Sequence, residues 1–125
     1  MAAPHIKRKR ILFVEDHEDT WEIVALNLAG YEVVCARGFD EGLRLAQQGH
    51  FALYILDNWL PDGSGVELCR WIRESDPQTP ILFYSAAGYK RDIDEGLSAG
   101  AQAYLVKPVD FAELKQAVER LTSSA

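Results

Sequence analysis

The chain has 125 residues, of which 48% are hydrophobic and 26% charged, as is typical of a globular protein forming one domain around its own core. Its net charge of −6 conceals an asymmetry: 4 of the 13 basic residues stand at positions 7–10, and the remainder holds 9 basic against 19 acidic side chains. Such an acidic body argues against a nucleic-acid-binding face, because affinity for a duplex depends largely on Lys and Arg.

The N-terminal segment contains the basic run Lys7–Arg10, which we interpret as a solvated lead-in to the first strand. Contact with an acidic partner is the alternative. No apolar stretch approaches the roughly 18 residues that cross a bilayer, so we expect no membrane contact. Cys35 and Cys69 show no C-x-x-C spacing, and no secretion signal precedes them. We therefore expect two free thiols and a cytoplasmic protein.

Strand and helix patterns alternate five times along the chain. The predicted elements are strands at 10–15, 32–36, 51–56, 80–84 and 103–106, each followed by a helix, at 19–29, 40–49, 65–75, within 85–100 and at 110–121. In the first helix, Ile23, Val24 and Leu28 are expected to face inward. The fourth helix is expected to be short, polar and mobile, because Gly88 and Gly96 weaken it.

Alternation of this kind predicts parallel strands joined by right-handed crossovers, with helices on both faces of the sheet. The strand at 32–36 is the least apolar, as expected at a sheet edge. The predicted fold is therefore an α/β, flavodoxin-like, five-stranded doubly wound parallel sheet in the order 2-1-3-4-5. We expect one domain over residues 10–121, preceded by the lead-in 1–9 and followed by a tail at 122–125.

Four of the apolar runs end on polar residues suited to phosphate chemistry: Glu15-Asp16, Asp57, Ser85 and Lys107. In open α/β sheets, ligands lie just beyond the carboxyl ends of the strands. If the four runs are neighbours in one sheet, three carboxylates, a hydroxyl and an ammonium converge there. The sequence thus predicts a site at this edge.

A divalent cation would offset the repulsion among three neighbouring carboxylates. Oxygen ligands without a His or Cys cluster favour Mg²⁺, with Mn²⁺ as a substitute, and His17 is not expected to be a ligand. Asp57, at the centre of the group, is the candidate nucleophile toward phosphorus. Lys107 would offset charge on the phosphoryl oxygens, and Ser85 would donate a hydrogen bond to them.

Four motifs join these residues into a larger pattern: Val14-Glu15-Asp16, Asp57-x-x-Leu60-Pro61-Asp62-Gly63, Ser85-Ala86 and Tyr104-x-x-Lys107-Pro108. With these motifs the chain resembles the CheY-like receiver domains of two-component response regulators, from residue 10 to about 121. The resemblance implies a signalling switch in a phosphorelay, one that catalyses only its own phosphorylation and dephosphorylation.

The resemblance also implies roles for individual residues. Asp57 would accept a phosphoryl group from a phosphohistidine on a histidine kinase or histidine phosphotransfer protein. Asp16, Asp57 and the backbone carbonyl of Trp59 would bind Mg²⁺, with Glu15 acting through water. Ser85 and Tyr104 would form the switch, and the Lys107–Pro108 peptide would be cis. The fourth helix, fifth strand and fifth helix would contact a downstream partner or output domain. We expect a monomer, and leave dimerisation on phosphorylation open.

Two positions depart from the usual receiver pattern. Trp59 overhangs the expected site, and Ala87 offers no polar group to position water, so we expect a long-lived phosphoryl group. A phosphorylation-independent interaction module is the alternative function. A phosphatase of the haloacid dehalogenase type is excluded, because Trp59 stands where that class needs a second Asp. Whether the chain is a stand-alone protein or part of a longer regulator stays open.

Overall fold

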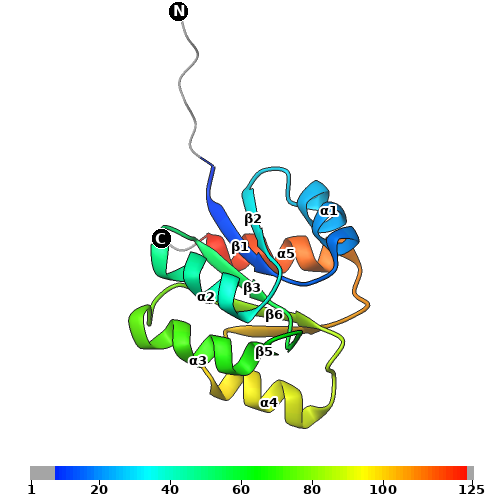
Figure 1. The fold of residues 1–125 in the computed structure, drawn as a ribbon. Helices are drawn as coiled ribbons and strands as arrows, with labels where there is room; N and C mark the ends of the chain where they lie inside the picture. Colours follow the sequence, from blue (N-terminus) through cyan, green and yellow to red (C-terminus); the bar gives the residue numbers. More distant parts are fainter. Residues whose placement is uncertain (1–7, 124–125) are drawn as a thin grey trace, which may run out of the picture.

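The computed structural model describes residues 8–123, and one parallel sheet forms its centre (Figure 1). The sheet has five strands in the order β2-β1-β3-β6-β7, which is the predicted order 2-1-3-4-5 in structural labels. The strands are β1 (Arg10–Val14), β2 (Glu32–Ala36), β3 (Leu53–Leu56), β6 (Ile81–Ser85) and β7 (Ala103–Val106). The fold-class prediction is confirmed.

Five helices cover the two faces of this sheet. They are α1 (Glu18–Asn27), α2 (Phe39–Gln48), α3 (Gly65–Ser75), α4 (Lys90–Ser98) and α5 (Phe111–Thr122). Figure 1 shows α1 and α5 together on one face and α2, α3 and α4 on the other. Each face has its own buried apolar cluster, one around Phe83 and Leu68 and the other around Phe13 and Leu114. The central strands β3 and β6 are buried along their whole length.

Two helices differ in detail from the sequence-based expectation. In α1, Val24 and Leu28 are buried as predicted, but Ile23 is 44% exposed, so its predicted inward orientation was wrong. The reason is that α1 carries apolar residues around its circumference, and Leu26 is 78% exposed on the outer side. The short length predicted for α4 is confirmed by its nine residues, and its mobility stays a prediction.

A small hairpin between β3 and α3 was not predicted. Its strands are β4 (Trp59–Leu60) and β5 (Gly63–Ser64), which pair antiparallel across the turn formed by Pro61 and Asp62. Asp62 in the turn accepts hydrogen bonds from the backbone N–H groups of Phe39 (2.6 Å) and Asp40 (3.1 Å). These bonds lower the pKa of Asp62 and tie the hairpin to the start of α2.

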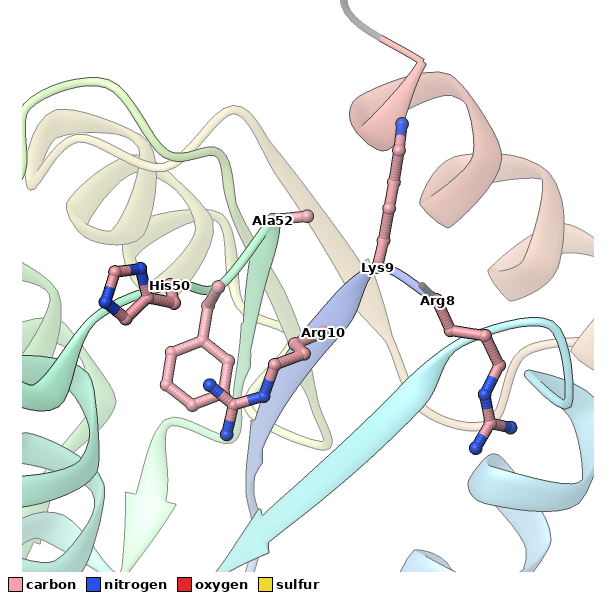
Figure 2. Close-up of a pocket in the computed structure, with 6 residues that line it drawn as sticks. Arg8, Lys9, Arg10, His50 and Ala52 are labelled. Atoms are coloured by element: carbon pink, nitrogen blue, oxygen red, sulfur yellow. The ribbon is translucent and has the colours of Figure 1, made fainter. Parts of the chain in front are cut away.

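Arg8, Lys9 and Arg10, at the start of β1, contact the fold at three separate places (Figure 2). The guanidinium of Arg8 donates to the carbonyl of Ala29 beyond α1 (3.3 Å), and the Lys9 ammonium donates to the carbonyl of Thr122 at the end of α5. Cations are favoured at helix C-termini, where carbonyls lack partners. Arg10 pairs with the Glu32 carboxylate at 2.9 Å.

These three side chains also line an open cavity of about 300 Å³, together with His50, Phe51 and Ala52. The Arg10 guanidinium lies 4.5 Å from the centre of the Phe51 ring. Because each cation already has a partner within the fold, the contacts favour a structural lead-in over a site for an acidic partner. Residues 1–7, including Lys7, lie outside the described part, as do residues 124–125 of the predicted tail. Helix α5 extends to Thr122, the first tail residue.

Both cysteines are free thiols: Cys69 is buried and Cys35 partly buried. Burial raises the pKa of each thiol to about 11. None of the helices within residues 8–123 has the length and apolarity needed to cross a bilayer.

Gly65, the first residue of α3, lies directly against the end of β3. A Cβ atom at this position would lie 2.3 Å from the backbone oxygen of Asp57. We therefore expect Gly65→Ala to reduce the free energy of unfolding by about 2–3 kcal/mol, measured by urea denaturation. Gly30→Ala is the matched control, because nothing lies within 4 Å of its added Cβ. Equal urea midpoints for the two variants would contradict this packing.

Candidate functional site

The backbone ladder continues past the strand ends and fixes the residues that follow them. The N–H of Glu15 donates to Ala36 (2.9 Å), and that of Asp57 donates to Val14 (3.0 Å). At the other side, the N–H of Lys107 donates to the carbonyl of Ser85 (2.9 Å). Strand pairing therefore gathers these side chains at one edge of the sheet, as the sequence predicted.

The ammonium of Lys107 lies between two buried carboxylates. Its Nζ atom is 2.5 Å from Oε1 of Glu15 and 3.4 Å from Oδ2 of Asp57. The Glu15 side chain is fully buried, and that of Asp57 is 8% exposed. Burial alone lowers the pKa of Lys107, but the hydrogen bond to Glu15 and the charge of Asp57 outweigh it, so the net pKa is raised. Lys107 is therefore held in its charged form.

The other oxygen of Asp57 accepts two hydrogen bonds. The Ser85 hydroxyl donates to Oδ1 at 2.7 Å, and the backbone N–H of Trp59 donates to the same atom at 3.1 Å. The Ser85 oxygen in turn accepts from the N–H of Ala87 at 3.2 Å. Asp57 is thus oriented from two sides, with Lys107 at its other oxygen.

Glu15, Asp16 and His17 form a second group beside Asp57. One ligand atom from each of the three lies within 4.8 Å of the others. Oδ1 of Asp16 is buried and has no hydrogen-bond partner among the described residues. A buried carboxylate oxygen that accepts no hydrogen bond fits a hard cation as a further partner. The donor set therefore fits Mg²⁺.

His17 is the residue of this group that the sequence did not assign to it. Its Nδ1 lies 3.0 Å from Oε2 of Glu15 and 3.2 Å from Oδ1 of Asp16, with the side chain 72% exposed. The hydrogen bond with Glu15 and the charge of Asp16 raise the pKa of His17. One indication in the sequence that His17 belongs to this group was its position directly after Asp16.

The side chain of Tyr104 points into the fold beside Ser85. Its hydroxyl donates to the carbonyl of Ala87 at 2.5 Å, and its ring stacks on Phe83 with centroids 5.2 Å apart. A Cβ on Gly96 of α4 would lie 3.0 Å from the Tyr104 ring. The absence of a side chain at Gly96 therefore makes room for the inward orientation.

Two aromatic side chains near the strand ends are exposed: Trp59 of β4, at 63%, and Tyr89, the residue before α4, at 76%. Ala87, by contrast, is buried. The Lys107–Pro108 peptide bond is cis, as the resemblance implied.

Tyr84, the neighbour of Ser85, is a residue whose contact the sequence did not reveal. The Nζ atom of Lys107 lies 5.1 Å from the centre of the Tyr84 ring. An aromatic residue near the end of a buried strand was visible in the sequence, but its contact with the lysine that follows β7 was not.

The sequence and the fold match those of known proteins. A family model for the response regulator receiver domain matches residues 11–119. The transcriptional regulatory protein CusR of Escherichia coli is 40% identical over 114 residues, which cover 90% of this chain and 50% of CusR. PcoR, from the same species, is 38% identical over 119 residues, covering 94% of this chain and 53% of PcoR. The chain thus spans about half the length of these regulators.

Two solved structures share the whole fold. The chemotaxis protein CheY4 of Vibrio cholerae superposes with a TM-score of 0.85 at 30% identity, covering 91% of this chain and 98% of CheY4. A CheY-like receiver domain protein from Methanospirillum hungatei gives a TM-score of 0.87, also at 30% identity, with 91% and 93% covered.

Proposed function

The chain belongs to the response regulator receiver domain family, whose role is phosphorylation-based switching, and we propose that Asp57 is the residue that accepts the phosphoryl group. Receiver domains are signalling switches and not conventional enzymes. The observation that carries the proposal is the buried Asp57 carboxylate, which lies within reach of the Lys107 ammonium and the Ser85 hydroxyl. As the receiver unit we propose residues 10–121.

The proposed donor is a phosphohistidine on a histidine kinase or histidine phosphotransfer protein. An oxygen of Asp57 attacks phosphorus, the P–N bond to the imidazole breaks, and an aspartyl phosphate forms. Lys107 offsets the charge that develops on the phosphoryl oxygens, and Ser85 donates a hydrogen bond to them. In dephosphorylation, water attacks phosphorus, the bond between phosphorus and the Asp57 oxygen breaks, and inorganic phosphate leaves.

Asp16, Asp57 and the carbonyl of Trp59 would hold Mg²⁺ or Mn²⁺, with Glu15 acting through a water molecule. The ion supplies positive charge that offsets the carboxylates and the incoming phosphoryl group. The buried oxygen of Asp16, which accepts no hydrogen bond from the described residues, supports this assignment.

The proposed switch consists of Ser85 and Tyr104. A phosphoryl group on Asp57 adds charge and acceptors next to Ser85, and only contacts that differ between two conformations shift their populations. Tyr104 connects Ser85 and Ala87 to the face formed by α4, β7 and α5. We propose this face as the contact for an output domain or separate partner protein, including a second phosphorylated copy of the chain.

Phosphorylation by a small donor tests the proposal directly. We expect the protein, incubated with acetyl phosphate and Mg²⁺, to gain about 80 Da by intact mass spectrometry, the mass of one HPO₃ group. EDTA should prevent the gain if a divalent cation is required. A protein that gains no mass, yet binds its partners, would instead be the phosphorylation-independent module.

Trp59 is expected to prolong the phosphorylated state. Its exposed indole and the apolar Ala87 leave no polar side chain at these two positions to orient a water molecule toward Asp57. We expect the aspartyl phosphate to persist for minutes or longer, and Trp59→Met to shorten its half-life, followed by mass spectrometry after removal of the donor. Trp71→Met is the control, because it removes the half-exposed indole of a different tryptophan, which lies on α3. A wild-type half-life of seconds that rises on Trp59→Met would contradict this role.

A further inference from the structure

Tyr84 is an unexplained residue in strand β6, where it follows the apolar residues Ile81, Leu82 and Phe83. It is the penultimate residue of β6, is only 5% exposed, and packs in the apolar cluster on the α1 and α5 face. A Leu or Val would fill such a position without bringing a hydroxyl into the fold. The contact that an aliphatic side chain at this position could not make is the one between the Tyr84 ring and the Lys107 ammonium.

The Tyr84 ring is held by its own strand and by Phe13 of β1. The strand is paired on both sides, and Tyr84 itself stands opposite Leu105 of β7. Phe13 is fully buried, and its ring centroid lies 6.5 Å from that of Tyr84 at an interplanar angle of 39°. The ring is therefore a fixed surface, with little freedom to follow the Lys107 side chain.

The Lys107 ammonium lies between this ring and the carboxylates. Nζ is 5.1 Å from the ring centre, within the range of a cation–π contact, while Glu15 and Asp57 accept its hydrogen bonds. The lysine side chain is only 21% exposed, so water screens these contacts weakly. An aliphatic side chain at position 84 would offer the charge no electrostatic partner there.

We propose that Tyr84 is a positioning residue for Lys107: its ring holds the ammonium where it reaches both Glu15 and Oδ2 of Asp57, the residue that would carry phosphate. Asp57 is the weaker of the two acceptors, at 3.4 Å against 2.5 Å for Glu15. An ammonium released from the ring has more room to move with Glu15 away from Asp57. The effect of Tyr84 on phosphorylation rests on the proposed role of Asp57. The position of the Lys107 ammonium over the Tyr84 ring does not depend on that role.

Proton NMR of the Lys107 side chain tests the geometry without any phosphorylation. Protons above an aromatic ring are shifted upfield, so the ε-methylene protons of Lys107 should be upfield of those of other lysines in protein with ¹³C-labelled lysine. Lys107→Arg assigns the signal by its disappearance. Tyr84→Phe should keep the shift and Tyr84→Leu should lose it. Wild-type ε-protons at the ordinary lysine position would overturn the proposal, even if the Leu variant does not fold.

The rate of phosphorylation by acetyl phosphate tests the consequence. We expect Tyr84→Phe to react within about twofold of the wild type and Tyr84→Leu about fivefold more slowly, with unchanged urea midpoints for the Phe variant. A Phe variant as slow as the Leu variant would assign the effect to the hydroxyl and overturn the proposal. So would a Leu variant that reacts at the wild-type rate. If the wild type itself gains no phosphate, the proposed function fails while the NMR result still decides the role of Tyr84.

Discussion

Asp57→Asn is expected to abolish the gain of about 80 Da on incubation with acetyl phosphate and Mg²⁺. An amide oxygen is a far weaker nucleophile than a carboxylate, and no other carboxylate is bound by both Lys107 and Ser85 among the described residues. The substitution keeps the size of the side chain. The fold should therefore survive, which circular dichroism and urea denaturation would confirm.

Asp94→Asn is the matched control for this variant. Asp94 lies exposed on α4, where it pairs with Lys90 at 2.7 Å, and it pairs with neither Lys107 nor Ser85, the side chains that contact Asp57. The Asp94→Asn variant should be phosphorylated on Asp57 at the wild-type rate. An undiminished adduct on Asp57→Asn would show that another group takes the phosphate and would refute the assignment of Asp57.

Lys107→Met is expected to lower both stability and the rate of phosphorylation. Removing the ammonium leaves Glu15 buried and without its cationic partner, a change that costs about 3 kcal/mol in comparable buried pairs. Loss of one charged group that stabilises developing phosphoryl charge typically slows such a reaction about 100-fold or more. Urea denaturation and the acetyl phosphate reaction measure the two effects separately.

Two comparisons separate the charge effect from a general packing effect. The double variant Glu15→Gln with Lys107→Met removes the unpaired charge and should recover most of the lost stability. Lys90→Met, at a position where the lysine side chain is 89% exposed, should change stability by less than about 0.5 kcal/mol. If Lys107→Met is as stable as the wild type, the ammonium does not offset the buried acids.

The pH dependence of stability follows from the raised pKa of Lys107. The folded state retains this proton to higher pH than the unfolded state does, so the ammonium stabilises the fold fully below about pH 10.4, the ordinary lysine pKa. This contribution is lost as the pH rises through the folded-state pKa. The difference in unfolding free energy between wild type and Lys107→Met should therefore shrink at strongly alkaline pH.

Much of the fold and the site was predictable because one pattern fixes both. Alternation of short apolar runs with helices determines a parallel sheet, and the residue after each run must then lie at the carboxyl edge. This reasoning placed Asp57, Ser85 and Lys107 together without any knowledge of their side-chain contacts.

What the sequence did not reveal depends on contacts between elements. Ile23 is outside because α1 has no single apolar stripe from which to read its inner face. The hairpin around Asp62 has strands of two residues, too short to show a period. An inward-turning Tyr104 was implied by the family resemblance, but its contacts with Phe83 and Gly96, residues from two other elements, were not. Similarly, the contact of Tyr84 with Lys107 requires the spatial relation of β6 and β7.

The backbone bonds that extend the sheet to Asp57 and Lys107 also couple this site to global unfolding. Both amides donate to carbonyls of neighbouring strands, Val14 and Ser85, which belong to the buried centre of the fold. Amides in such strands exchange with solvent deuterium only when the whole domain opens. We therefore expect the backbone amides of Asp57 and Lys107 to exchange slowly with solvent deuterium. Slow exchange there would leave side-chain motion as the way for this site to signal to other parts of the domain.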